Sequence, residues 1–106
     1  MKEHTLPTID RNGFEFVNAV ELNAAHPDSF WIPDEDRRTT LEAGDIVKLV
    51  FAFGPEEGTE RMWVKVTGRS GELYEGEVNN FPVSDRVAVE ERVVFGAEHV
   101  IDVSDE

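Results

Sequence analysis

The chain has 106 residues, 40% hydrophobic and 9% aromatic, which is typical of one globular domain. Its 23 acids and 10 bases give a net charge of −13, which disfavours direct binding to nucleic acid or an anionic membrane, because both need a basic surface. It has no cysteine, which excludes disulfides, zinc–thiolate sites and thiol nucleophiles.

The N-terminal residues 1–13 form a polar lead that ends in the turn dipeptide Asn12-Gly13. The lead lacks the apolar stretch of a signal peptide, and no apolar run in the chain is long enough to cross a bilayer. We therefore expect a cytoplasmic protein with a single β-rich domain over residues 14–103 and an acidic tail over residues 104–106.

The segment from Phe14 to Ala25 predicts a helix, near residues 15–25, that packs on a sheet. Phe16 and Val20 lie near one stripe of this helix. The helix ends at His26-Pro27, since the residue before a proline avoids the α region. A strand over residues 14–17 is the alternative reading.

The next segment places Phe30, Trp31 and Ile32 between two prolines. This composition favours an ordered extended segment, in which Trp31 is predicted to be a core residue. Residues 33–38 predict a short helical turn that serves as a connector, with acids at its positive end and arginines at its negative end.

A β region begins after Gly44-Asp45. Between residues 46 and 53 the odd positions are all large and apolar, so period two predicts that they face the core, while the even face is only partly covered. Residues 54–59 predict a loop, because they include two glycines, a proline and two adjacent acids. The core-facing residues are Val47, Leu49, Phe51 and Phe53.

Two further strands are predicted over residues 61–67 and 73–78, joined by a turn at residues 68–72. In the first strand Met62, Val64 and Val66 share one face, which puts Trp63 on the other face. The favoured register pairs apolar with apolar residues and opposite charges with each other. It joins Thr67 to Leu73, Val66 to Tyr74, Lys65 to Glu75, Trp63 to Glu77 and Met62 to Val78, and it sets Gly76 opposite Val64, where a missing side chain permits a bend.

Residues 79–82 predict a turn, because asparagine tolerates left-handed backbone and proline cannot extend a central ladder. Residues 83–91 are ambiguous, and residues 92–95 and 98–103 predict two last short strands. The predicted fold class is α+β, with one N-terminal helix on a small, strongly bent antiparallel sheet of about five strands or an SH3-like barrel.

Several short motifs stand out: Phe30-Trp31-Ile32-Pro33, residues 44–49 and 60–64, the spacing of Gly76 and Asn79 before Pro82, and Phe95 with residues 98–102. Together they resemble the YegJ-like group of small bacterial proteins, a domain-of-unknown-function family. The resemblance covers roughly residues 14–103 and implies a bacterial origin and a compact β-rich domain. The group has no established activity, so it assigns no catalytic residue, although some relatives resemble immunity proteins of bacterial toxin systems.

No residue pattern predicts a catalytic site, a cofactor or a metal ion. His4, His26 and His99 are the only histidines, and on a strand His99 and Asp102 would point to opposite faces. Acids are so numerous that some pair must lie close by chance, and none has the spacing of a calcium loop. We therefore expect a protein that is not an enzyme.

One strand face combines Trp63 with Arg61 and Lys65. An aromatic side chain flanked by cations is typical of binding surfaces. The alternative is that Trp63 is covered by the N-terminal helix or by Trp31, with the cations reaching outward to solvent.

The segment from Glu72 to Glu106 holds ten acids and two bases. This excess predicts a basic protein partner, attracted electrostatically. The expected function is a non-catalytic protein-binding module, immunity-like or inhibitor-like; the alternative is a structural or regulatory interaction module that uses the Trp63 face, with the charge serving only solubility. The candidate acidic contacts are Glu75, Glu77, Glu90 and Glu91.

Overall fold

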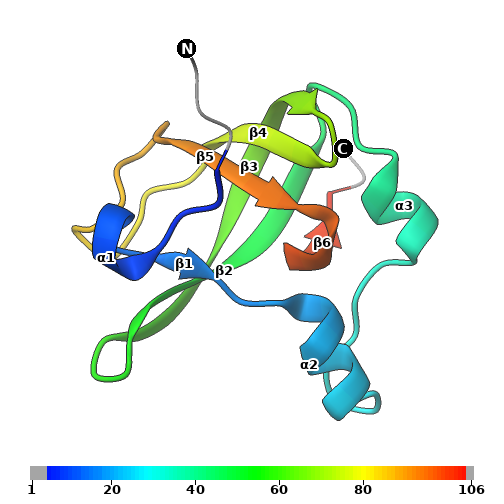
Figure 1. The fold of residues 1–106 in the computed structure, drawn as a ribbon, viewed down its shortest axis with the longest axis horizontal. Helices are drawn as coiled ribbons and strands as arrows, with labels where there is room; N and C mark the ends of the chain where they lie inside the picture. The colour runs from blue at the N-terminus through cyan, green and yellow to red at the C-terminus, as the bar shows by residue number, and fades with distance from the viewer. Residues whose placement is uncertain (1–4, 105–106) are drawn as a thin grey trace.

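The computed structural model describes residues 5–104, which form a strongly bent antiparallel sheet with short helices at its margins (Figure 1). The predicted α+β class and bent sheet are confirmed, with six strands rather than five. No helix in the described part of the chain is long and apolar enough to cross a membrane. The elements are α1 (Ile9–Asn12), β1 (Glu15–Phe16), α2 (Ala19–Ala25), α3 (Glu35–Thr39), β2 (Ile46–Gly54), β3 (Gly58–Ser70), β4 (Leu73–Val78), β5 (Arg92–Gly96), the 3-10 turn η1 (Ala97–His99) and β6 (Val100–Val103).

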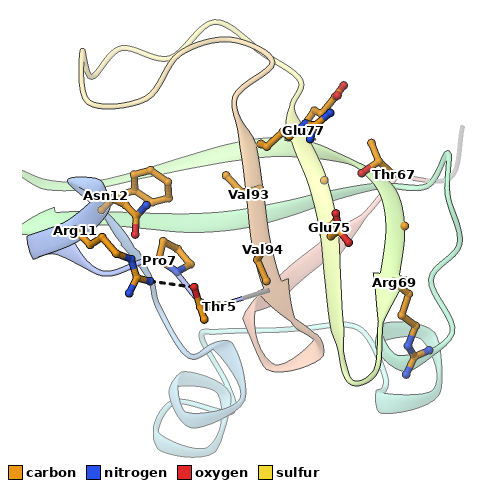
Figure 2. Close-up of a pocket in the computed structure, with 14 residues that line it drawn as sticks. Thr5, Pro7, Arg11, Asn12, Thr67, Arg69, Glu75, Glu77, Val93 and Val94 are labelled. Atoms are coloured by element: carbon orange, nitrogen blue, oxygen red, sulfur yellow. Dashed lines mark hydrogen bonds between the residues drawn. The ribbon is translucent and has the colours of Figure 1, made fainter. Parts of the chain in front are cut away.

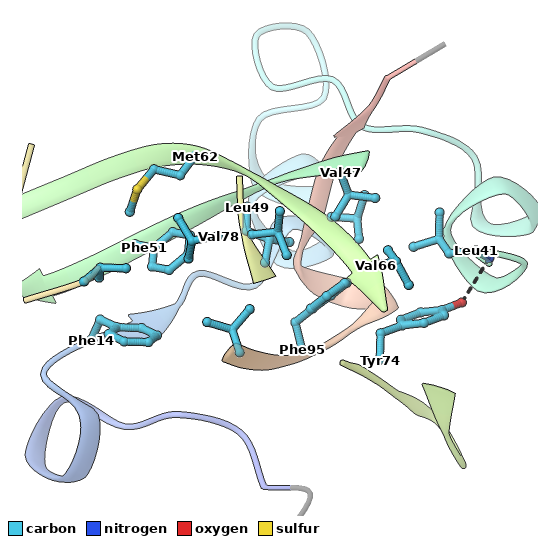
Figure 3. Packing of buried hydrophobic residues seen from close by; sticks show 14 of the residues in the cluster. Phe14, Leu41, Val47, Leu49, Phe51, Met62, Val66, Tyr74, Val78 and Phe95 are labelled. Carbon is cyan, nitrogen blue, oxygen red and sulfur yellow. Dashed lines mark hydrogen bonds between the residues drawn. The ribbon is translucent and has the colours of Figure 1, made fainter. Parts of the chain in front are cut away.

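The sheet has the order β1-β2-β3-β4-β5, and β6 returns to pair with β2. Since β3 pairs along one edge of β2, both β1 and β6 must pair with its other edge. This return of the last strand curls the sheet around one apolar interior, which Figure 3 shows between β2, β3 and β5.

The period-two reading of β2 and β3 is confirmed. The odd residues of β2 and the three apolar residues of β3 are all buried in the main core. On the even face of β2, Val50 packs with Ala19 and Ile101 in a second, smaller cluster that the start of α2 covers. The predicted packing of a helix on the sheet therefore occurs, on the face expected to be only partly covered.

The predicted helix begins too early. Residues Glu15–Phe16 form β1, and α2 begins only at Ala19, because the Asn18 side chain caps it by accepting the Glu21 backbone N–H at 3.0 Å. Phe14 is buried with its ring centroid 5.2 Å from that of Phe51, so tertiary packing holds this stretch extended. The alternative strand reading of residues 14–17 is the correct one.

The predicted position of Trp31 is wrong, because 72% of this residue is exposed. Phe30 and Ile32 pack against the smaller cluster instead, so the alternation of this extended segment turns Trp31 outward. The helical turn expected next is present as α3. It ends near Arg38, whose buried guanidinium donates to the carbonyls of Pro33 and Ala97 at 2.9 and 3.1 Å.

The predicted register of β3 and β4 is wrong. The turn is confined to Gly71-Glu72, so β3 continues to Ser70, which pairs with Leu73. A register shift at Thr67 then changes the pairing, so that Lys65 lies opposite Glu77 rather than Glu75, and Trp63 does not pair with Glu77. The observed partners are Val64 with Val78, Lys65 with Glu77, Val66 with Gly76, Gly68 with Glu75, and Arg69 with Tyr74.

Gly76 does mark a close approach, as expected, although Val66 rather than Val64 lies opposite it. A Cβ atom at Gly76 would lie 2.6 Å from Val64 Cγ1 and 2.8 Å from the Lys65 carbonyl oxygen. The bend of the sheet at this point therefore requires glycine.

The last predicted strand is two residues shorter than expected, because Glu98 and His99 belong to η1 and β6 begins at Val100. Residues 79–91 contain no helix or strand, in agreement with the predicted turn at their start. This long connection and the β2–β3 turn lie at the same end of the sheet (Figure 1).

Candidate functional site

The β2–β3 turn and the long β4–β5 connection are tied together by specific contacts. The Glu60 carboxylate accepts the backbone N–H groups of Val83 at 2.8 Å and Ser84 at 3.1 Å. Arg86 forms an ion pair of 2.5 Å with Glu57 in the turn. We call residues 54–60 and 79–91 together the hairpin–loop end.

The β4–β5 connection is fixed along its length. The Asn80 side chain accepts the Trp63 backbone N–H at 2.6 Å near its start, and Val87 is buried in the main core at its middle. Near its end the Glu91 carboxylate accepts the Ala88 N–H at 2.9 Å, and the Glu90 N–H donates to the Val78 carbonyl at 2.8 Å. The loop therefore presents its remaining side chains from a defined backbone.

The two most exposed large apolar side chains of this loop are Phe81, with 87% exposed, and Val83, with 92% exposed, while Val89 is 44% exposed. Isolated exposed apolar residues are ordinary, but here two lie within three residues on an anchored loop. Val83 also borders a hollow of about 490 Å³ with Phe53 and Ser84. These features are typical of a preorganised contact for another molecule.

The hairpin–loop end is strongly acidic. Its two segments contain six acids and one base, and that base, Arg86, is already paired with Glu57. The exposed Phe81 and Val83 therefore lie on segments rich in negative charge. The acids are Glu56, Glu57, Glu60, Asp85, Glu90 and Glu91.

The structure separates the four acids predicted as partner contacts. Glu90 and Glu91 belong to the hairpin–loop end, whereas Glu75 and Glu77 lie on β4. There Glu77 pairs in register with both Lys65 and Arg92, so its charge lies among cations. The four acids predicted as partner contacts thus do not gather on one surface.

The predicted face of Arg61, Trp63 and Lys65 exists on β3, with these three residues opposite in direction to the buried ones. Sequence reasoning missed Lys48, which pairs with Trp63 from β2 and places its Nζ 4.6 Å from the indole centroid. Trp63 is half-buried, and Arg61 lies over the Phe30 ring at 5.9 Å.

A larger hollow, of about 650 Å³, lies between the N-terminal segment and strands β3, β4 and β5 (Figure 2). Two of its three arginines are engaged by backbone: Arg11 donates to the Leu6 carbonyl at 2.5 Å, and Arg69 donates to the carbonyls of Gly71 and Thr39, each at 2.9 Å. These guanidinium groups stabilise the surrounding chain, and the hollow carries no set of converging groups for chemistry.

His99 is the buried histidine of the chain's described part, and its contacts are structural. Its Nδ1 accepts the Gly96 N–H at 2.9 Å, so the ring proton of the neutral form is on Nε2, which lies 4.0 Å from a Glu98 carboxylate oxygen. Burial lowers the pKa of His99, and the Glu98 charge opposes this effect. The hydrogen bond to Nδ1 comes from Gly96, the last residue of β5, rather than involving Asp102, and His4 lies outside the described residues.

Within residues 5–104 no group of three or more histidines, aspartates or glutamates is arranged to hold a metal ion. No family model matches the chain, and neither a curated protein nor a solved structure matches it significantly. The resemblance to the YegJ-like group therefore stays a prediction.

The residues that sequence reasoning missed at the hairpin–loop end are Phe81, Val83 and Glu60. The signal for the first two was their presence in a segment that proline and asparagine mark as a turn, where apolar side chains have little access to a core. Nothing in the sequence indicates the Glu60 contact, which joins residues more than twenty positions apart.

Proposed function

We propose that this protein is a non-catalytic binding module that engages a basic protein partner through the hairpin–loop end. The observation that carries this proposal is the pair of exposed apolar side chains, Phe81 and Val83, on a loop anchored by hydrogen bonds and by buried Val87. Apolar anchors presented from a rigid backbone lose little conformational entropy on binding, which favours affinity.

The acids of this end support a basic partner. Six acids on these two segments attract a basic surface during encounter and disfavour an acidic one. The complementary surface is an apolar depression with lysine or arginine at its rim. Such a surface is common where proteins handle polyanions, so an inhibitor-like or immunity-like role that occludes it is the specific form of the proposal.

The test is affinity capture from bacterial lysate with the wild-type chain and with the double variant Phe81→Ser, Val83→Ser. A basic protein should be retained by the wild type, identified by mass spectrometry and then measured as a purified protein. The double variant should bind it at least about 30-fold more weakly, the effect of losing about 2 kcal/mol at a hot spot.

Val20→Ser is the matched control, because Val20 is also exposed but lies on α2. It should leave the affinity unchanged. An acidic partner, or equal affinity for the wild type and the double variant, would contradict the proposal. The bacterial origin and cytoplasmic location expected from the sequence remain part of this proposal.

A further inference from the structure

A second surface of opposite charge lies on the outer side of β2 and β3. We call it the tryptophan face and define it by six residues. Trp31 is 72% exposed there, and Trp63 is half-buried on β3, where it pairs with Lys48. A hollow of about 210 Å³ is bordered by Trp31, Lys48 and Arg61. The six residues are Phe30, Trp31, Lys48, Arg61, Trp63 and Lys65.

In the sheet, Asp102 lies opposite Lys48 and Glu77 lies opposite Lys65, but no acid lies opposite Arg61, which pairs with Val50. Among the described residues, ion pairs join Arg37 to Asp45 and Arg86 to Glu57, but none includes Lys48, Arg61 or Lys65. Three cations against these two acids leave one net positive charge on this face, in a chain that has 23 acids and 10 bases. This charge is available to a ligand.

Two of the cations lie over aromatic rings. Lys48 Nζ is 4.6 Å from the Trp63 centroid, and the Arg61 guanidinium carbon is 5.9 Å from the Phe30 centroid. The one acid that borders the hollow, Asp102, accepts its neighbour Val103 N–H at 2.8 Å. The face thus combines flat apolar area with cationic donors.

We propose that the tryptophan face binds an acidic segment of another protein that also carries aromatic or aliphatic side chains. The cations complement its carboxylates, and the exposed indole of Trp31 with the half-buried Trp63 supplies apolar contact. The rest of the protein, with its large excess of acids, repels such a segment, so binding is confined to this face. Single-stranded nucleic acid would also find rings and cations here, so a competition with oligothymidine is needed to separate the two ligands.

The test is a fluorescence-anisotropy titration with a short fluorescein-labelled peptide in which glutamate alternates with leucine and tryptophan. The wild type should bind it and should bind more weakly the same peptide with glutamine in place of glutamate, because the amide removes the negative charge that the cations complement. Arg61→Glu should weaken binding by about tenfold, and Trp31→Ala, which changes no charge, by about fivefold. Oligothymidine should not compete with the peptide.

Arg92→Glu is the matched control, because it is the same charge reversal on the exposed side of β5, two strands from Lys65. It should change the affinity by less than about twofold. Circular dichroism checks that each variant is folded. Trp31→Ala serves as a second variant of this face, because Trp31 is exposed and its loss removes no core contact. Equal effects of Arg61→Glu and Arg92→Glu, no binding of the acidic peptide, or displacement by oligothymidine would overturn the proposal. These variants leave Phe81 and Val83 intact, so the result is independent of the basic-partner proposal.

Discussion

The Glu60 carboxylate accepts the backbone N–H of Val83 at 2.8 Å and so joins the first residues of β3 to the middle of the β4–β5 connection. A second bond from Ser84 makes the contact bidentate. An otherwise exposed loop is thereby held by a side chain from a neighbouring strand. The fixed exposure of Val83 and Phe81 depends on this contact.

Replacing Glu60 with alanine should loosen the loop without unfolding the sheet. Hydrogen exchange at the Val83 and Ser84 amides should accelerate, and the free energy of unfolding should fall by about 1 kcal/mol, because two charge-assisted but partly solvated bonds are lost. Glu56→Ala is the control, since Glu56 is an exposed acid in the same hairpin. Unchanged exchange at both amides in Glu60→Ala would show that the loop is held by other contacts.

The bend at Gly76 is testable with a second glycine as its control. Gly76→Ala should lower the free energy of unfolding by roughly 1–3 kcal/mol, because the new Cβ would lie 2.6 Å from Val64 Cγ1 and 2.8 Å from a backbone oxygen. Gly68→Ala meets no atom within 4 Å and should be neutral or stabilising by up to about 1 kcal/mol. Urea unfolding measures both, and equal stability of the two variants would contradict the close approach at Gly76.

Strands β2, β3 and β4 show which parts of the fold the sequence predicts. The faces of β2 and β3 follow from period two, which depends only on neighbouring residues, and they are correct. The predicted register of β3 with β4 is wrong. The true register depends on a turn confined to Gly71-Glu72 and on the shift at Thr67, and neither follows from residue type alone.

Trp31 and the hairpin–loop end show the same limit for the candidate site. A large aromatic side chain predicts burial on average, but the alternation of residues 30–32 against the smaller cluster turns Trp31 outward. The acids between Glu72 and Glu106 predict a charged segment, yet β4 places Glu77 between two cations while Glu90 lies in the loop. Which of these charged residues lie together depends on the topology of the sheet, which the sequence pattern does not give.

Buried His99 predicts a loss of stability in mild acid. Burial lowers its folded-state pKa below the ordinary 6.5, so the unfolded chain takes up a proton first as the pH falls. The contribution of neutral His99 to the free energy of unfolding is therefore fully present above about pH 6.5 and is lost as the pH falls toward the folded-state pKa. In a plot of the free energy of unfolding against pH, His99→Gln should lack this loss of stability. The variant His26→Gln, at an exposed histidine, should retain it.

The Glu98 charge offers a second test of the same group. It raises the pKa of His99 against the effect of burial, so Glu98→Gln should lower that pKa further and enlarge the loss of stability in acid. Thermal unfolding between neutral pH and pH 5 measures the slope for each chain. A slope in Glu98→Gln equal to that of the wild type would show that the two groups are not coupled.

The last prediction concerns the rate of association with a basic partner and rests on the proposed function. Charge reversal at the hairpin–loop end, Glu56→Lys with Glu90→Lys, should slow association by about tenfold at low salt, because the local field is reduced where the partner arrives. The dissociation rate should change less, since both side chains are exposed and the apolar contacts are kept. Glu21→Lys with Glu42→Lys changes the net charge equally but away from the two segments of the hairpin–loop end, so its smaller effect would separate a local field from total charge. Stopped-flow measurements across a range of ionic strengths give both rates, and equal slowing by the two double variants would assign the steering to net charge and leave the hairpin–loop end with only its apolar anchors.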